Sequence, residues 1–295
     1  MQVVQDSAEH HFLTLLEKIK PDPAGWVGIH CVFSRQLDHD ALIADLPSLP
    51  DRIAALSDES RQFLVTLTQK AGAFENPVIY HFADNDILLI AHPEGEAAQE
   101  AFYTLFKDIS ASVKTGLVDF ISFGREMLNV QKLADRKILA QKKMKTYEAL
   151  ADANRIASIP IRRQRREHAV VLIVEDDRFT ATYTSGILAK NYDLVHARTG
   201  EDAVLDYIEH APDIVFLDIH LPGLNGLETL HAIRQADPEG HVVMLSVDTA
   251  RTNVMLATRY GAAGFLKKPF SKDRILAIVE KSPFIKGSKS IVNRA

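Results

Sequence analysis

Residues 171–177 read VLIVEDD, an apolar run that ends in three carboxylates. Four more short apolar runs follow along the chain, and predicted helices separate them: Leu194–Ala197, Ile214–Leu217, Val242–Leu245 and Gly264–Leu266. Strands that alternate with helices indicate a parallel sheet, and strands that are apolar throughout indicate that helices cover both of its faces. We therefore expect an α/β fold in residues 169–282, with a doubly wound, five-stranded parallel sheet.

The polar residues of this region lie directly after the predicted strands. Five of them are Glu175, Asp176, Asp218, Ser246 and Lys268. Because the carboxyl ends of parallel strands form the crevice of an open sheet, we expect these side chains to meet there. Converging carboxylates require a cation, and oxygen ligands of this kind favour Mg²⁺. Asp218 is the natural nucleophile, since carboxylates form aspartyl phosphates.

A simpler interpretation of each acid is a helix cap or a solvated side chain. That interpretation suffices for a single residue, but five suitable residues after four different strands argue against it. Four stretches also resemble the response-regulator receiver domain of two-component signalling, and they occur in that family's order. They are VLIVEDD at 171–177, IVFLDIHLPGLNG at 214–226, VVMLSVD at 242–248 and GAAGFLKKPF at 261–270.

The resemblance implies a flavodoxin-like receiver whose Asp218 accepts a phosphoryl group from the phosphohistidine of a histidine kinase or a histidine phosphotransfer protein. The other matching residues are Glu175, Asp176, Asp218 and the His220 backbone carbonyl for Mg²⁺, Ser246 and Lys268 for the phosphoryl group, and Phe265 for the aromatic switch position. Val247 stands where the family usually has a small residue. His220 and Asp248 occupy positions that tune phosphate lifetime in the family, so we expect a lifetime unlike that of small chemotaxis-type receivers.

The net charge of −5 conceals segments of different charge. Residues 1–124 hold 8 Lys and Arg against 18 Asp and Glu, whereas residues 125–168 hold 12 against 5. The basic segment contains no Gly and one Pro, so we interpret it as a connector between two domains. Residues 126–157 lack Pro and Gly and are rich in helix formers, which predicts one long helix that ends before Pro160.

Two interpretations of the connector helix remain open. It is either a short coiled coil, which allows a homodimer, or a single amphipathic helix packed on the N-terminal domain. Lys137 interrupts its apolar spacing. The arginine-rich run 162–166 indicates a solvated hinge, and contact with nucleic acid or an anionic membrane is the alternative. No aromatic residues accompany the run, so we prefer the hinge.

Residues 1–124 predict an α+β domain. The expected helices are Ala8–Ile19, Asp58–Ala71 with Ser57 as its N-cap, and Glu96–Ile109; the expected strands are Trp26–Phe33, Val78–Phe82, Ile87–Ala91 and Leu117–Phe123. This order resembles the GGDEF domain of diguanylate cyclases, with residues 83–87 in place of the signature turn. The two glycines and the strand carboxylate of that family are missing, which implies an inactive, degenerate module for binding or dimerisation. An unrelated α+β interaction domain is the alternative.

The composition narrows the class of protein. A chain with 46% hydrophobic and 25% charged residues is an ordinary globular protein. The single cysteine, Cys31, excludes an intrachain disulfide and a cysteine-based zinc cage. No apolar run approaches the roughly 18 residues of a membrane span, and the first residues lack the pattern of a secretory signal. We therefore expect a cytoplasmic protein that makes no membrane contact.

We divide the chain into an α+β domain (1–124), a basic helical connector (125–168), a receiver domain (169–282) and a short tail (283–295). The predicted function is a response regulator, not an enzyme, whose phosphorylation switches the interactions or dimerisation of its N-terminal module. Its downstream partner protein is unknown. The alternatives are a divergent nucleotide cyclase controlled by the receiver and a nucleic-acid-binding regulator that uses the basic connector.

Overall fold

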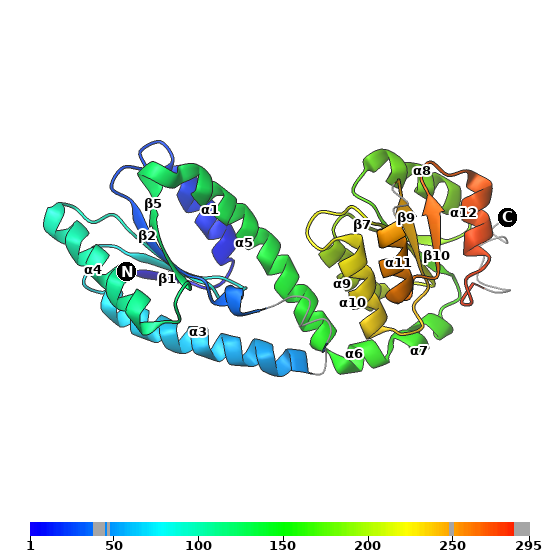
Figure 1. Ribbon diagram of the computed structural model, residues 1–295, viewed down its shortest axis with the longest axis horizontal. Helices are drawn as coiled ribbons and strands as arrows, with labels where there is room; N and C mark the ends of the chain where they lie inside the picture. The colour runs from blue at the N-terminus through cyan, green and yellow to red at the C-terminus, as the bar shows by residue number, and fades with distance from the viewer. Residues whose placement is uncertain (38–44, 46–47, 248–250, 286–295) are drawn as a thin grey trace. The chain divides into compact units, whose positions relative to one another are not determined.

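The computed structural model describes residues 1–37, 45, 48–247 and 251–285. The described residues divide into an N-terminal unit that ends at Met144 and a C-terminal unit that begins at Lys145. Each unit contains its own sheet, and Figure 1 labels most of the helices and several strands of both.

The N-terminal unit is built on a sheet whose described strands lie in the order β1-β3-β4-β2-β5. They are β1 (Gln2–Val4), β2 (Val27–Cys31), β3 (Val78–His81), β4 (Ile87–Ala91) and β5 (Val118–Ser122). β4 and β5 pair antiparallel with β2, β3 and β4 form an antiparallel hairpin, and β1 pairs parallel with β3. The predicted α+β organisation is confirmed, and so is the hairpin.

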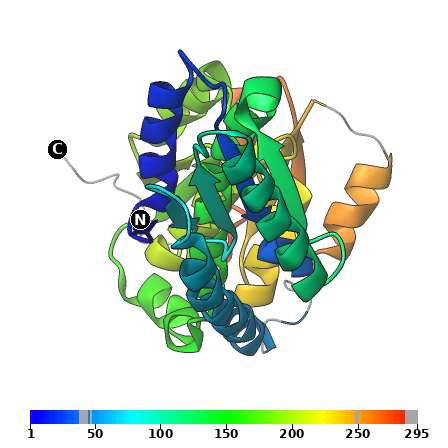
Figure 2. The ribbon, with the colours of Figure 1, turned by 90° about the vertical axis from the view of Figure 1, so that its left-hand side faces the viewer.

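Helices cover both faces of this sheet (Figures 1 and 2). They are α1 (Ala8–Ile19), α3 (Leu49–Ala71), α4 (Glu96–Ser112) and α5 (Phe123–Ala151). α1 and α5 pack on one face, and α3 and α4 pack on the other. Because successive strand residues point to opposite faces, Ile29 and Cys31 enter the core beneath α3 and α4, whereas His30 faces α5.

One expectation for the N-terminal unit is wrong, and one of its strands was not predicted. Ser57 does not cap a helix, because α3 already begins at Leu49. Pro50 and Asp51 lie in the first turn of α3. Proline suits this turn because its backbone N–H groups have no helical partner, and the negative charge of Asp51 interacts favourably with the positive end of the helix dipole. β1 was not expected either, because three residues are too few to show an alternating pattern.

The connector consists of three helices in the described chain, not of one helix over residues 126–157. They are α5, which is kinked at Glu126, then α6 (Ala153–Ala157) and α7 (Ile159–Arg165). Asp152 separates the first two and caps α6, since its side chain accepts the backbone N–H of Arg155 at 3.0 Å. Pro160 does not end a helix as expected but lies in the first turn of α7, where no helical hydrogen bond needs its N–H. None of the described helices combines the length and the apolar character of a membrane span.

The C-terminal unit has a parallel sheet in the order β10-β9-β8-β6-β7. Its strands are β6 (Val170–Val174), β7 (Asp193–Ala197), β8 (Ile214–Asp218), β9 (Val242–Ser246) and β10 (Gly264–Lys267). Its helices are α8 (Arg178–Leu188), α9 (Gly200–His210), α10 (Gly226–Ala236), α11 (Arg251–Arg259) and α12 (Lys272–Val279). α8 and α12 pack together against one face, and α10 packs between α9 and α11 on the other. The expected doubly wound, flavodoxin-like fold with a five-stranded sheet is confirmed.

The turn after β8 brings the start of α10 against the end of that strand. A Cβ atom on Gly226 would lie 2.0 Å from the carbonyl oxygen of Asp218, so this position admits no side chain. The backbone N–H of Gly226 donates to the carbonyl of Ile219 at 2.9 Å. α10 therefore begins directly on the strand end that carries Asp218.

Gly226→Ala is expected to destabilise the protein by about 1–3 kcal/mol, because the backbone must shift to admit the methyl group. Gly186→Ala, inside α8, is the matched control, since a Cβ atom there meets no described atom within 4 Å. The control is expected to raise stability by about 0.5–1 kcal/mol, the usual advantage of Ala over Gly in a helix. Urea unfolding measures both effects, and equal stability of the two variants would contradict the close approach.

Candidate functional site

Three carboxylates gather at the carboxyl edge of the parallel sheet. Glu175 and Asp176 directly follow β6, and Asp218 is the last residue of β8, which pairs with β6. Ligand oxygens of all three lie within 4.8 Å of one another. Glu175 and Asp218 are only 2% and 6% exposed, whereas Asp176 is open to solvent. The structure thus brings together three of the residues that the sequence singled out.

Lys268 places an ammonium group among these acids. Its Nζ lies 2.5 Å from Oε2 of Glu175 and 3.1 Å from Oδ1 of Asp218. Its backbone N–H donates to the carbonyl of Ser246 at 2.8 Å, which ties the residue after β10 to the end of β9. The ends of four strands therefore meet around one cluster of opposite charges.

The other predicted site residues lie at the same edge of the sheet or close to it. Ser246 ends β9 and is buried, Phe265 is half-buried in β10, and His220 is exposed in the loop after β8. Val247 is also exposed. Asp248 lies outside the described residues. The roles of these residues toward a phosphoryl group stay predictions.

The cluster carries an excess of negative charge that a further cation would relieve. Burial raises the pKa of the Glu175 carboxyl, and the charge of Asp218 adds to this effect, while the ammonium of Lys268 opposes it. Neither oxygen of Glu175 accepts a hydrogen bond of standard geometry from a described residue. Carboxylate oxygens that open to water on one side are the donors that Mg²⁺ prefers. The residues present therefore fit Mg²⁺, with Glu175, Asp176 and Asp218 as ligands.

Comparison with known proteins identifies the family of this site. The response regulator receiver domain family matches residues 171–280. The chain is 37% identical over 114 residues to the chemotaxis protein CheY of Bacillus subtilis, a match that covers 38% of this chain and 95% of that protein. The chain belongs to the response regulator family. As a response regulator it is a component of two-component signalling, and the receiver resemblance seen in the sequence is confirmed.

Two further relatives carry a receiver that is similar to this one. The nitrogen assimilation regulatory protein NtrX of Azorhizobium caulinodans is 36% identical over 115 residues, which cover 38% of this response regulator but only 25% of NtrX. The crystal structure of the receiver domain of NtrX from Brucella abortus is 34% identical and covers 38% of this chain and 96% of that one, with a TM-score of 0.36.

A second charged cluster lies in the N-terminal unit, where the β3–β4 turn meets α5. Lys137 is 4% exposed, and its ammonium contacts the carboxylates of Asp84, at 2.7 Å, and of Asp86. Asp86 also accepts the backbone N–H of Ser34 at 2.7 Å and lies 3.3 Å from Nε2 of His30. One buried ammonium thus holds two buried carboxylates of the turn against the helix.

The pKa values of the two carboxyl groups of this cluster shift in opposite directions. Burial opposes the ionisation of Asp86, but the hydrogen bond from His30 and the charge of Lys137 outweigh it and lower the pKa of Asp86 to about 2. Burial raises the pKa of Asp84, although Lys137 opposes this shift. The cluster was not predicted, although the sequence contains a signal for it: Lys137 interrupts an apolar helix face, and a cation there requires a buried partner.

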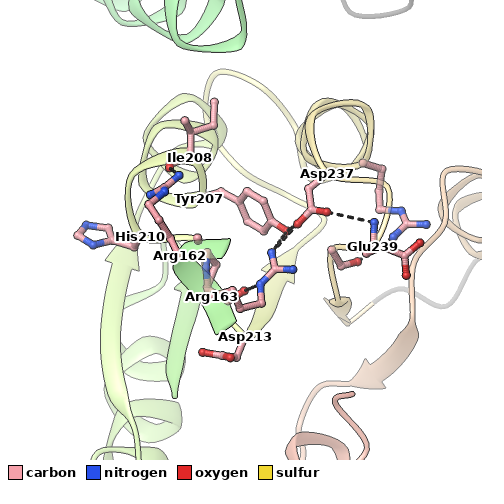
Figure 3. Close-up of polar contacts among 12 residues, drawn as sticks. Arg162, Arg163, Tyr207, Ile208, His210, Asp213, Asp237 and Glu239 are labelled. Atoms are coloured by element: carbon pink, nitrogen blue, oxygen red, sulfur yellow. Dashed lines mark hydrogen bonds and ion pairs between the residues drawn. The ribbon is translucent and has the colours of Figure 1, made fainter. Parts of the chain in front are cut away.

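The arginines of residues 162–166 do not form the expected solvated hinge. Arg163 is 2% exposed, donates from Nε to the carbonyl of Pro212 at 3.0 Å, and forms an ion pair with Asp237 (Figure 3). Arg162 and Arg166 donate to backbone carbonyls in and just after the last turn of α9. Those carbonyls have no helical partner and lie at the negative end of the helix dipole, so guanidinium groups stabilise them. The run therefore packs on the receiver.

Lys137→Met is expected to lower the free energy of unfolding by about 3–5 kcal/mol, because it leaves two buried carboxylates without their cation. Lys132→Met is the matched control on the same helix, since Lys132 is exposed, and its effect is expected to stay within about 0.5 kcal/mol. Urea unfolding at neutral pH measures both. A Lys137→Met protein as stable as the control would contradict the inferred role of the ammonium.

Proposed function

We propose that this response regulator accepts a phosphoryl group on Asp218 from the phosphohistidine of a histidine kinase or a histidine phosphotransfer protein. The observation that carries the proposal is the cluster at the sheet edge, where the carboxylate of Asp218 lies 3.1 Å from the ammonium of Lys268 and within reach of two further acids. Carboxylates of this kind act as phosphoryl acceptors when nearby cations neutralise the transferred group.

In the proposed reaction, a carboxylate oxygen of Asp218 forms a bond to phosphorus. The bond from phosphorus to the donor's histidine nitrogen breaks, and the nitrogen keeps the electron pair. Lys268 faces the incoming phosphoryl oxygens and stabilises their charge, while the hydroxyl of Ser246 at the end of β9 offers a hydrogen bond. Glu175, Asp176, Asp218 and the carbonyl of His220 would hold Mg²⁺, which would neutralise the remaining negative charge. The 6% exposure of Asp218 limits competing water.

We further propose that the N-terminal unit is a degenerate GGDEF-like module that binds a partner or dimerises and has no enzymatic activity. Its strands, helices and hairpin follow the order that suggested this resemblance. Lys137 forms ion pairs with both turn carboxylates, Asp84 and Asp86, so a lysine ammonium lies where a metal would meet these acids. Adjoining cavities of about 380 and 300 Å³, both lined by His30, Asp119 and Arg136, offer room for a ligand.

We favour interaction of this module with a protein partner, or homodimerisation through α5, in the cytoplasm. The nucleic-acid alternative relied on the basic connector, with the arginines of residues 162–166 and the lysine-rich helix before them. Three of these arginines, Arg162, Arg163 and Arg166, are engaged within the receiver. A positive surface that binds phosphates would have to come from other residues, so we do not propose this function.

Asp218→Asn is expected to abolish phosphoryl labelling, because the amide lacks the nucleophilic oxygen. Wild-type protein incubated with acetyl phosphate and Mg²⁺ is expected to give a slower band on a phosphate-affinity gel, and chelation of Mg²⁺ is expected to remove that band. Asp273→Asn, an exposed acid in the first turn of α12, is the control and should label like the wild type. Labelling of Asp218→Asn, or none in the wild type with any donor, would contradict the proposal.

A further inference from the structure

The loop after the phosphoacceptor strand, residues 219–225, is fastened to two helices. We refer to it as the acceptor loop. The carboxylate of Glu201 at the start of α9 is 1% exposed and accepts the backbone N–H of Leu224 at 3.0 Å. At the other side of the loop, Asn225 caps α10 through a reciprocal capping box with Glu228. A displacement of the acceptor loop is therefore expected to displace the first turns of both α9 and α10.

The opposite ends of the same two helices meet at one arginine of the connector. The hydroxyl of Tyr207 in α9 donates at 2.6 Å to Asp237, the C-cap residue that directly follows α10. Arg163 of α7 donates to that hydroxyl at 2.9 Å and forms an ion pair with the same carboxylate (Figure 3). All three side chains are at most 4% exposed. Arg163 thus holds the C-terminal ends of α9 and α10 together.

The charge of this junction is stable at neutral pH. Burial opposes the ionisation of Asp237, but the hydrogen bonds from Tyr207 and Arg163 outweigh it and lower the pKa of this carboxyl. The ring of Phe284 covers the guanidinium of Arg163, whose central carbon lies 4.3 Å from the ring centre. Such a desolvated, charge-assisted contact keeps a definite geometry, because a displaced partner would leave a buried charge unpaired.

The rest of the connector is fastened to the same helices. Arg162 donates to the carbonyl of Ile208 at 2.6 Å, and Arg166 donates to the carbonyl of Ala211 at 2.8 Å. Thr146, in the last turns of α5, donates to the carbonyl of Glu201 at 3.4 Å. The connector from residue 145 to residue 166 therefore contacts both ends of α9.

We propose that α9 and α10 transmit the phosphorylation state of Asp218 to the connector helices, with Arg163 as the residue that couples them. This inference rests on the proposed phosphorylation of Asp218. α10 has 11 residues and spans about 16 Å, from the backbone of Asp218 to Arg163.

The physical basis of the coupling is close packing at both ends of α10. Gly226 leaves no free space against Asp218, so a rearrangement of the acceptor loop that makes room for a phosphoryl group must displace the start of α10. A short helix moves as a rigid body, and its far end carries Asp237. Close-packed ion pairs change between discrete arrangements and do not lengthen gradually. Arg163 therefore either moves together with the carboxylate of Asp237 or loses its ion pair with it. Both outcomes alter the position of α7.

Hydrogen exchange of the full chain tests this coupling. Beryllofluoride with Mg²⁺ is the probe, because it mimics the phosphoryl group on an aspartate without turnover. Binding is expected to change the exchange rates of backbone amides in α7 (Ile159–Arg165) by about fivefold or more, the scale of a typical coupling free energy. The same change is expected in Arg165→Met, the matched control, since Arg165 is exposed on the same helix.

Arg163→Met supplies a readout that a purely structural role would not change. Coupling is reciprocal, so loss of the contact must alter the affinity of Asp218 for beryllofluoride, again by about fivefold. A merely structural arginine would lower the unfolding temperature and leave this affinity unchanged. Tyr207→Phe removes one hydroxyl from the same junction and is a milder variant in case Arg163→Met does not fold. Its affinity is expected to shift in the same direction.

The outcomes separate this inference from the proposed function. Absence of beryllofluoride binding together with absence of acetyl-phosphate labelling would refute phosphorylation of Asp218, and the inference with it. Binding that leaves α7 exchange unchanged, with equal affinities in Arg163→Met, Tyr207→Phe and the wild type, would overturn the coupling alone. Binding that alters α7 in the wild type and in Arg165→Met, with shifted affinities in the junction variants, would establish it.

Discussion

The receiver of this response regulator depends on the repulsion among three carboxylates and on the ammonium that compensates it. Ligand oxygens of Glu175, Asp176 and Asp218 lie within 4.8 Å of one another, a distance at which partly buried like charges repel strongly. Lys268 supplies one positive charge, 2.5 Å from the first acid and 3.1 Å from the third. The parallel sheet makes this cluster unavoidable, because all its strands end at the same edge. The remaining negative charge therefore favours a further cation at this edge of the sheet.

Buried charges are paired in the same way in two other parts of the molecule. Lys137 joins α5 to the β3–β4 turn, and Arg163 joins α7 to the ends of α9 and α10. In each case the partners come from elements that are distant in the sequence. Such a pair adds little net stability over an apolar contact, but removal of one partner strongly destabilises the fold because it leaves a buried charge unpaired. These pairs therefore specify how helices attach to their sheet, and through Arg163 they join the connector to the receiver.

Local patterns predicted most of the elements, and they were wrong where two local signals competed. Ser57 is a good N-cap residue, yet Pro50 and Asp51 begin α3 two turns earlier, and the packing of that helix on the sheet extends it. Pro160 is a helix breaker in the interior of a helix and a good residue in a first turn. The break at Asp152 decides which of these two applies. Single-sequence signals do not rank such alternatives, because the deciding energy is tertiary.

The sequence by itself determined the receiver. Its strands are short apolar runs, its functional side chains follow them directly, and the topology of a parallel sheet gathers whatever follows the strands. Only the tertiary structure decided the partners of the basic residues. A lysine on a helix and a run of arginines have the same sequence pattern whether water or a buried carboxylate surrounds them. For Lys137 and Arg163 the difference is the desolvation of partners 51 and 74 residues away, a distance that no local pattern spans.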